Sequence, residues 1–378
     1  MKNLHIYLFI ALCGLLLSCS PSEQAVNPPG AASSDSALLA QPTGSESFSV
    51  FLSGSQVGQM AVTHDDQTTV AYEYRSNGRG PSVNETIKFG DDGFPEAWTV
   101  AGATTFGNPI NESFQIVDGR ANWTDTTGFN EADLQEAKLY LAQESSPYSL
   151  WVYSRLLLAE PDRTMSILPT GEIKLEEIES IQVSSAAGTE SVTTYALSGF
   201  ALNPTYFALD ASDRLFATMS ERFALVRQGF EGEEQRLREL TAEYTTLRFE
   251  SIQEKVSRDL SLLIRITNVR LFDPSTLSLT DPVSVLVEGN RIASVAGANE
   301  SNADNELIID GNGGTLVPGM YEMHGHIGQG NALLNVAAGI TSVRDMGNNN
   351  EVLDDMIEKI AAGRLVGPRI TRSGFIEG

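Results

Sequence analysis

From Phe48 onward, apolar and polar side chains alternate in short runs, and this alternation limits what the chain can fold into. In one such run, Val70, Tyr72 and Tyr74 alternate with Ala71, Glu73 and Arg75. Because successive side chains of a strand point to opposite faces of a sheet, the period of two predicts antiparallel strands with one buried face. Clusters of Gly, Asn and Asp between the runs supply turns. We therefore expect a curved, β-rich domain over residues 46–230.

Other elements of this domain follow from the same patterns. Strands are expected at residues 83–89, 98–101, 114–117, 121–123, 165–168, 173–183 and 192–197, and helices at 131–142 and 150–159. The aromatic residues Tyr72, Tyr74, Trp98 and Trp123 fit either a sheet core or a ligand pocket, and core is the commoner role of such a face. His64 is expected at the surface. No motif in this domain indicates its function.

The N-terminus has the pattern of an export signal. Lys2 precedes an apolar stretch over residues 4–17, which is too short to span a bilayer as a helix. The stretch ends in Leu-Ser-Cys-Ser and resembles the bacterial lipobox, in which the cysteine, here Cys19, is lipidated. Residues 1–19 are then a lipoprotein signal peptide and 20–45 a Pro- and Ser-containing disordered tether. The alternative is an ordinary signal peptide with an incidental cysteine.

The same segment bears on redox chemistry and location. Both cysteines, Cys13 and Cys19, lie in it, so the exported protein would have no disulfide. Ser20 after the cysteine resembles the sorting signal for the outer membrane, which predicts a lipid-anchored protein facing the periplasm.

Charge limits the partners of the chain. Its 378 residues include 49 acidic and 25 basic ones, a formal net charge of −24. A surface of this sign repels phosphate backbones, so nucleic-acid binding is disfavoured. The length predicts two or three domains.

A connecting helix is expected over residues 231–260. Leu237, Leu240, Tyr244 and Leu247 recur there at helical spacing. An apolar stripe of this kind predicts packing against a neighbour, with no role in binding a cofactor.

Beyond the helix, strands are expected at residues 263–272, at 283–296 as a hairpin around Gly289-Asn290, and at 307–309. A Pro-Gly turn at 318–319 then leads into a strand that ends in His324-Gly325-His326. Residues two apart on a strand share a face about 6–7 Å apart, so two imidazoles can converge on one metal ion. His-x-His alone is a weak signal. Its context strengthens it, because two of the four histidines of the chain stand together at a strand end.

From about Ile264 onward, these residues resemble the amidohydrolase superfamily. That resemblance implies a small β-sandwich over 261–315 and, over 316–378, the start of an α/β (β/α)8 TIM barrel, with helices at 331–339 and 352–360 and strands at 340–343 and 369–373. It also implies that His324 and His326 bind a catalytic divalent metal, with zinc expected from the imidazole ligands, as one or two ions. Glu322 stands where members of the family commonly have Asp.

The runs Ala-Gly-Ile-Thr-Ser-Val-Arg-Asp-Met-Gly at 338–347 and Gly-Pro-Arg-Ile at 367–370 resemble the branch of imidazolonepropionase-like enzymes and X-Pro dipeptidases. Arg344 and Asp345 fall at the end of the second barrel strand, on the face that holds active sites, and are candidates for substrate binding. An internal salt bridge or a loop cap is the alternative.

Function follows from the resemblance. A complete barrel needs about 250 residues, and residues 316–378 make up about a quarter of that length. We therefore expect an incomplete, truncated barrel, an N-terminal fragment inactive alone, and catalytic residues after Gly378. The parent protein is expected to hydrolyse carbon–nitrogen bonds of a non-peptide amide, a cyclic amide or a dipeptide. The alternative is a non-catalytic envelope lipoprotein whose β-rich domain binds a ligand or partner. The sequence leaves the oligomeric state open.

Overall fold

The computed structural model describes residues 42–134, 137–256, 263–298, 305–348 and 350–374. The expected signal peptide, most of the tether and the expected lipidation site Cys19 lie outside the described residues. Within these ranges, no helix is both long and apolar enough to cross a membrane.

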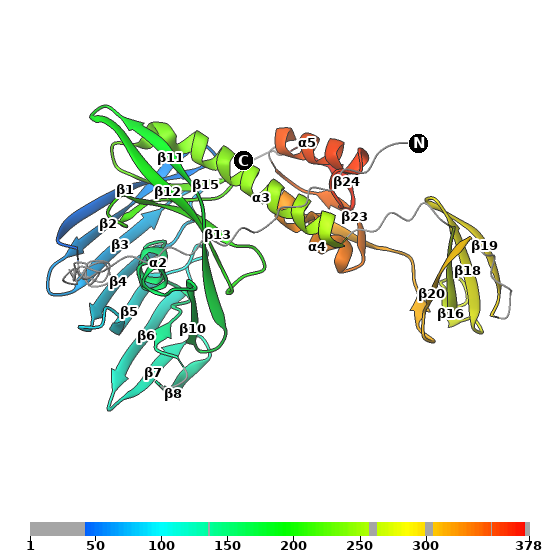
Figure 1. The fold of residues 1–378 in the computed structure, drawn as a ribbon, viewed down its shortest axis with the longest axis horizontal. Helices are drawn as coiled ribbons and strands as arrows, with labels where there is room; N and C mark the ends of the chain where they lie inside the picture. The colour runs from blue at the N-terminus through cyan, green and yellow to red at the C-terminus, as the bar shows by residue number, and fades with distance from the viewer. Residues whose placement is uncertain (1–41, 135–136, 257–262, 299–304, 349, 375–378) are drawn as a thin grey trace, which may run out of the picture.

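A single large sheet of fifteen strands occupies the first half of the described chain (Figure 1). Its strands are β1 (Gly44–Leu52), β2 (Ser55–His64), β3 (Thr68–Tyr74), β4 (Ser82–Phe89), β5 (Pro95–Ala103), β6 (Pro109–Val117), β7 (Arg120–Asp125), β8 (Gly128–Asp133), β9 (Leu139–Tyr140), β10 (Thr164–Leu168), β11 (Glu172–Ser185), β12 (Gly188–Ser198), β13 (Thr205–Asp210), β14 (Leu215–Met219) and β15 (Phe223–Arg227). Strands that are neighbours in the sequence pair with each other, except β8 and β9, which form the two ends of the sheet; β1 pairs antiparallel with β15. The chain is thus strand-rich with few helices, as the alternating pattern predicted.

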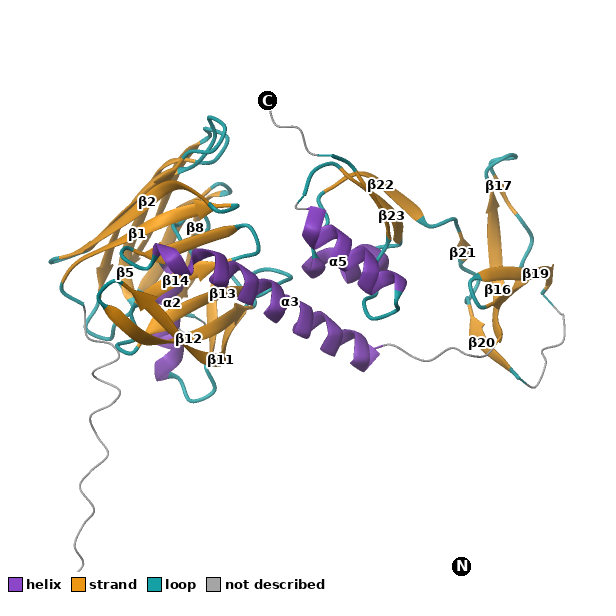
Figure 2. Ribbon diagram, turned by 90° about the horizontal axis from the view of Figure 1, so that it is seen from above, coloured by secondary structure: helices purple, strands orange, loops and turns teal. Residues whose placement is uncertain are grey.

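Helix α2 (Ser149–Ala159) lies within the curve of this sheet (Figures 1 and 2). The main apolar core joins α2 to inward-facing side chains of the strands, among them Trp98, Phe114 and Trp123. Tyr72 belongs to the same core, while Tyr74 is partly buried against it. The expectation that the aromatic face is core is confirmed for Trp98 and Trp123, whereas Tyr72 and Tyr74 also line a cavity.

Two buried glutamates hold the segment that leads into α2. Glu85 of β4 accepts hydrogen bonds from the indole N–H of Trp98, at 2.9 Å, and from the backbone N–H of Ser146. Glu112 of β6 accepts from the Tyr140 hydroxyl at 2.6 Å and from the backbone N–H groups of residues 143 and 144 at 2.9 Å. Buried carboxylates are stable only when they are hydrogen-bonded, and these bonds fix the position of α2.

The prediction of a helix at residues 131–142 is wrong. Strand β8 pairs there with β7 across a two-residue turn, with Asp125 opposite Gly128, and Leu139–Tyr140 forms β9, which runs parallel to β10. Leu139 and Tyr140 are both buried. Cross-strand pairing and burial outweigh the helix propensity of the Glu, Ala and Leu residues in this stretch.

The expectation that His64 lies at the surface is also wrong, because only 4% of its surface is exposed. One ring nitrogen lies 3.1 Å from the Thr68 hydroxyl, and the other lies 3.0 Å from Glu46 and 3.3 Å from the Tyr148 hydroxyl. Arg214 also contacts Glu46, at 2.7 Å. Sequence alternation predicted the strand but not the partners that make a buried histidine acceptable.

Helix α3 (Glu234–Val256) follows a 3-10 turn, η1 (Glu231–Glu233), and runs from the large sheet to the C-terminal elements (Figure 2). Leu237 and Tyr244 pack in a second core on the opposite side of the sheet, with Leu240 against them, as expected. Leu247 was expected to pack but is 57% exposed. Phe249 provides the next contact, because it is buried against residues of the C-terminal unit.

The C-terminal part contains two more sheets. The first comprises β16 (Leu263–Asp273), β17 (Ser278–Leu279), β18 (Val283–Glu288), β19 (Arg291–Gly297), β20 (Glu306–Asp310) and β21 (Thr315–Leu316), and the second comprises β22 (Met320–Gly325), β23 (Ile340–Asp345) and β24 (Arg369–Arg372). Helices α4 (Gln329–Ala337) and α5 (Asn350–Ala361) connect the three parallel strands of the second sheet. The chain therefore forms two successive β-α-β units, which bring the carboxyl ends of β22 and β23 to one edge.

Candidate functional site: a histidine pair beside a cavity

His324 and His326 lie at the carboxyl end of β22, the first strand of the parallel sheet. His324 is within the strand and His326 follows its last residue. Their ring centroids are 5.5 Å apart, with an interplanar angle of 67°. Both side chains are exposed. The structure thus brings the predicted pair together at a sheet edge that solvent and ligands can reach.

Gly325 is required between the two histidines. A Cβ atom placed on it would lie 2.6 Å from a methyl group of Val343 on the neighbouring strand. Because Val343 is buried in the core under the sheet, the contact could not be relieved without moving that strand. The small residue therefore allows β22 and β23 to pair where the histidines project.

The tautomer of His326 follows from its hydrogen bond. Its Nδ1 lies 2.8 Å from the carbonyl oxygen of Gly347, which can only accept, so Nδ1 carries the proton. In the neutral ring, Nε2 then has a free lone pair. A backbone carbonyl is one of the usual partners that orient a metal-ligating histidine through its second ring nitrogen.

Asp345 holds the two loops beside His326 in place. Its side chain is fully buried and accepts hydrogen bonds from the backbone N–H groups of Ile327, at 2.7 Å, and Gly347, at 3.0 Å. The amide of Asn348 lies 3.3 Å from the same carboxylate. Asp345 thus joins the loop that follows His326 to the loop whose carbonyl orients His326.

Arg344 and Glu322 contact the strand itself. The Nε of Arg344 donates to the carbonyl oxygen of Met323 at 2.8 Å, and a Glu322 carboxylate oxygen accepts the backbone N–H of His324 at the same distance. Arg344 is exposed, so a ligand can still reach its guanidinium. A role for Arg344 or Asp345 in substrate binding stays a prediction, while the contacts seen give both residues a structural role.

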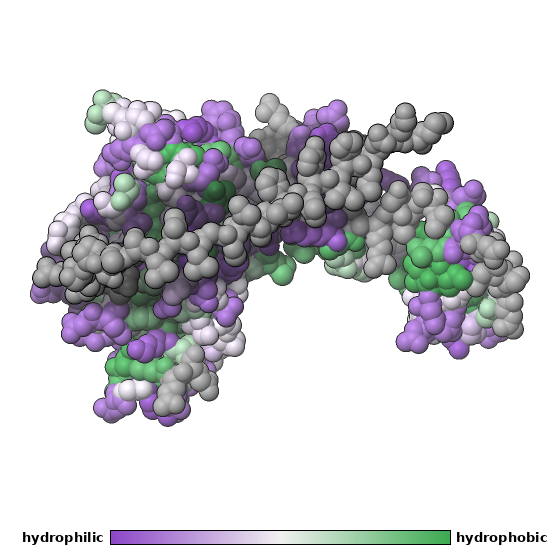
Figure 3. Space-filling model, viewed as in Figure 1, coloured by the Kyte–Doolittle hydropathy of each residue, from purple (hydrophilic) through white to green (hydrophobic). Residues whose placement is uncertain are grey.

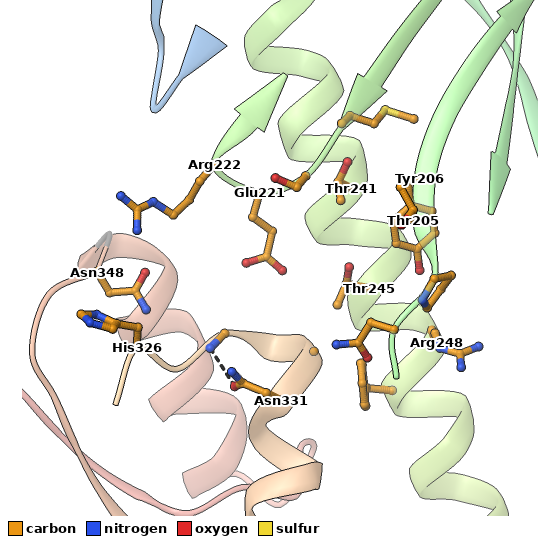
Figure 4. A pocket seen from close by; sticks show the side chains of 17 residues that line it. Thr205, Tyr206, Glu221, Arg222, Thr241, Thr245, Arg248, His326, Asn331 and Asn348 are labelled. Atoms are coloured by element: carbon orange, nitrogen blue, oxygen red, sulfur yellow. Dashed lines mark hydrogen bonds between the residues drawn. The ribbon is translucent and has the colours of Figure 1, made fainter. Parts of the chain in front are cut away.

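A cavity of about 410 Å³ lies beside His326 (Figure 4). It is bounded by the ends of β13 and β14, by α3 and by the start of α4. The lining residues labelled in Figure 4 are Thr205, Tyr206, Glu221, Arg222, Thr241, Thr245, Arg248, His326, Asn331 and Asn348. Three segments that are far apart in the sequence therefore meet beside His326.

Charged groups of the cavity come from the sheet domain and from α3. Burial raises the pKa of Glu221, whose carboxylate points into the cavity in Figure 4. One of its oxygens lies 3.6 Å from where a Cβ would stand on Gly328, directly before α4. The Nε of Arg248 is buried and has no hydrogen-bond partner among the described residues. The cavity can therefore offer both a carboxylate and a guanidinium to a ligand.

No pattern in the sequence pointed to these cavity residues. Glu221 follows β14 and Arg248 is on α3, more than 70 residues before His326. No local motif connects them, since only the packing of α3 against both parts brings them to one place. Glu85 and Glu112 carried a usable signal, because each is an acidic residue at an inward position of an alternating strand.

The donor set suits a first-row metal such as zinc, for which imidazole is a preferred ligand. Two imidazoles with the geometry above could hold such an ion. Among the described residues, however, no group of three or more His, Cys, Asp or Glu side chains could hold a metal together. The described chain therefore offers the histidine pair as a partial ligand set.

Comparison with known proteins finds only partial similarity. No family model matches the chain, and no curated protein matches it. Among solved structures, an Xaa-Pro dipeptidase with bound methionine is similar over 30% of this chain and 33% of its own, with 25% identity and a TM-score of 0.28. Phenylurea hydrolase B is similar over 30% of this chain and 31% of its own, with 26% identity and a TM-score of 0.26.

A β-barrel-like protein of a domain of unknown function from Brucella abortus is similar over 50% of this chain and 96% of its own, with 10% identity and a TM-score of 0.33. The chain spans about a third of the length of the two hydrolases that it matches.

Proposed function

We propose that the chain carries the first metal ligands of an amidohydrolase-type, metal-dependent hydrolase that acts on carbon–nitrogen bonds of a non-peptide amide, a cyclic amide or a dipeptide. The observation that carries the proposal is the histidine pair at the carboxyl end of β22, with Nδ1 of His326 bonded to the Gly347 carbonyl, so that Nε2 is the ring nitrogen that can bind a metal. In this proposal, β22 to β24 with their helices are the start of a (β/α)8 barrel, whose active sites form at this end of the strands.

The residues of the chain would act by binding and orientation. A divalent metal, most simply zinc, would polarise an amide carbonyl or a bound water. His324 and His326 would hold that ion through imidazole nitrogens. Gly347 would keep the His326 ring in one tautomer and one direction, and Asp345 would keep Gly347 in place.

Zinc binding tests the proposal directly. In a calorimetric titration of the full chain with Zn²⁺, His324→Ala and His326→Ala should each weaken binding at least tenfold, because each removes a ligand. Met323→Ala is the matched control, since Met323 lies on the same strand and is also exposed. Equal zinc affinity in the wild type and both histidine variants would reject the metal site.

The second candidate function is a non-catalytic envelope lipoprotein whose sheet domain binds a ligand. The open interior of the large sheet favours it, since a cavity of about 840 Å³ lies there. This function would be favoured over the hydrolase if the chain binds such a ligand and if neither His324→Ala nor His326→Ala changes its zinc affinity.

We also propose that the protein is anchored to the membrane through a lipid on Cys19 and faces the periplasm. The support is the Leu-Ser-Cys-Ser sequence that ends the apolar stretch. Cys19→Ser should abolish incorporation of labelled palmitate and move the protein to the soluble envelope fraction. Cys13→Ser is the matched control and should change neither result.

A further inference from the structure

The interior of the large sheet opens into a second cavity, of about 840 Å³, next to α2. Cavities that bind small molecules usually measure about 300–1,000 Å³. Aromatic and aliphatic side chains from β3, α2 and the turn after β12 line this one, among them Tyr72, Tyr74, Leu150, Tyr153 and Phe200. Its size and apolar walls are those of a ligand site.

No lining residue of this cavity carries a charge. The polar groups are all neutral, namely the hydroxyls of Ser, Thr and Tyr residues and the amide of Gln143. The contrast with the rest of the chain is large, because the formal net charge is −24. A charged ligand group would lose its hydration there without gaining an ionic partner, so the cavity favours an uncharged ligand.

One buried hydroxyl in the wall lacks a partner. Thr218 is 4% exposed, and its Oγ1 has no hydrogen-bond partner among the described residues. A buried polar group without a partner costs about 1–3 kcal/mol, and a ligand with a hydrogen-bonding atom could remove this cost. This observation is independent of the size of the cavity and points to an occupant.

The cavity adjoins the one beside His326. Thr205, Met219 and Ser220, at the ends of β13 and β14, line both of them. The charged residues Glu221, Arg222 and Arg248 line only the cavity at the histidines. The combined space is therefore uncharged and apolar inside the sheet and becomes polar toward His326.

We infer that the sheet domain forms the apolar half of the substrate site: an uncharged aliphatic or aromatic tail lies inside the sheet while the amide of the same molecule reaches His326. The substrate would then be an amide that carries a long, uncharged apolar substituent. This inference rests on the proposed hydrolase function for the amide end, whereas the tail site depends only on the sheet domain.

Phe200 offers a test with a matched control. It is 38% exposed, lies in the turn after β12 and lines the cavity, while Leu202 lies two residues on, is 81% exposed and lines neither cavity. Phe200→Asp places a charge in the wall, and Leu202→Asp places the same charge outside it. The exposure of both positions favours folding of both variants, which circular dichroism and thermal melting would verify.

The first measurement uses N-phenyl-1-naphthylamine, an uncharged dye that fluoresces in apolar sites, with the full metal-free chain. The wild type and Leu202→Asp should bind the dye with equal affinity, and Phe200→Asp should bind it at least tenfold more weakly. Uncharged N-alkyl acetamides should displace the dye more strongly as the alkyl chain lengthens. Equal dye affinity in the two Asp variants would overturn the inference.

The second measurement tests whether one ligand occupies both the sheet cavity and the site at His326. Zn²⁺ should strengthen binding of N-hexylacetamide several-fold in the wild type but not in His326→Ala, because only an amide that reaches the metal gains from it. Zinc binding with no effect on the amide would overturn the shared site.

The two proposals fail separately. Dye binding that depends on Phe200 in a chain that binds no zinc would retain the tail site and reject the hydrolase. Zinc binding that depends on His324 and His326, with dye binding indifferent to Phe200, would retain the hydrolase and reject the tail site.

Discussion

At the scale of single residues, buried carboxylates determine how loops and helices are positioned. Asp345 accepts two backbone N–H groups beside the histidine pair, and Glu85 and Glu112 accept those of the segment before α2. Hydrogen bonds to ionised groups are about twice as strong as neutral ones. A substitution that preserves shape but removes an acceptor should therefore have measurable effects.

Asp345→Asn should lower zinc affinity about tenfold, the lower end of what losing an outer-shell partner costs. The amide keeps one acceptor oxygen, so its NH2 group would face the backbone N–H of either Ile327 or Gly347, and the Gly347 carbonyl would hold His326 less firmly. The measurement is the zinc titration described for the histidine variants. Arg344→Gln is the control, because Arg344 is exposed and does not touch the two loops through its side chain; a zinc affinity for Asp345→Asn equal to that control would contradict the positioning role.

Glu85 predicts a pH dependence of stability. Burial raises its pKa from an ordinary value of 4.5 to about 7. The folded state then binds this proton more tightly than the unfolded state, so the free energy of unfolding should fall as the pH rises from 4.5 to about 7 and change little above that. The loss is about 3 kcal/mol at most, since one pKa unit corresponds to about 1.4 kcal/mol.

Urea unfolding between pH 4.5 and 8 measures this slope. Glu85→Gln should remove it, because the amide does not titrate. Glu131→Gln, at an exposed position of β8, should keep the slope of the wild type. A Glu85→Gln chain with the wild-type slope would assign the pH dependence to other groups.

At the scale of elements, α3 is the part that joins the sheet domain to the parallel sheet. Leu237 and Tyr244 pack against the large sheet, and Phe249 belongs to the core that includes Ile327 and Ala332, beside the histidine loop. The same helix supplies Thr241, Thr245 and Arg248 to the cavity at His326. Because one helix contacts both parts, its packing determines the shape of that cavity.

Phe249→Ala should destabilise the contact between α3 and the parallel sheet by about 3–5 kcal/mol, the usual cost of truncating a buried Phe. Limited proteolysis and hydrogen exchange should show α4 and β22 more open, with the large sheet unchanged. Leu247→Ala is the control, since Leu247 is 57% exposed and should change stability by less than about 0.5 kcal/mol. Equal protection of α4 in the two variants would refute the role of α3.

At the scale of the whole molecule, apolar side chains remain exposed in the C-terminal sheets. Figure 3 shows hydrophobic surface over the region of β16 to β20, where Leu277, Ile292 and Val295 are among the exposed residues. On β22, an edge strand of the parallel sheet, Tyr321 is 69% exposed. Exposed apolar residues on a sheet edge favour association between chains.

The isolated chain should therefore self-associate as its concentration rises. Tyr321→Lys should reduce this association, because a charge on an edge strand opposes edge-to-edge pairing. Sedimentation velocity over a range of concentrations measures it. Phe106→Lys, at an exposed turn of the large sheet, should leave it unchanged; association that Phe106→Lys reduces and Tyr321→Lys does not would place the interface on the sheet domain.

The sequence by itself determined most of the strands and the histidine pair, because alternation and His-x-His spacing are local properties of the chain. It predicted β4, α2 and the hairpin of β18 and β19, and failed at residues 131–142, where pairing partners decided the conformation. Only the tertiary structure placed Glu221 and Arg248 beside His326, buried His64 among its partners, and opened a neutral cavity inside the sheet. These features depend on contacts between segments far apart in the chain, which no local pattern encodes.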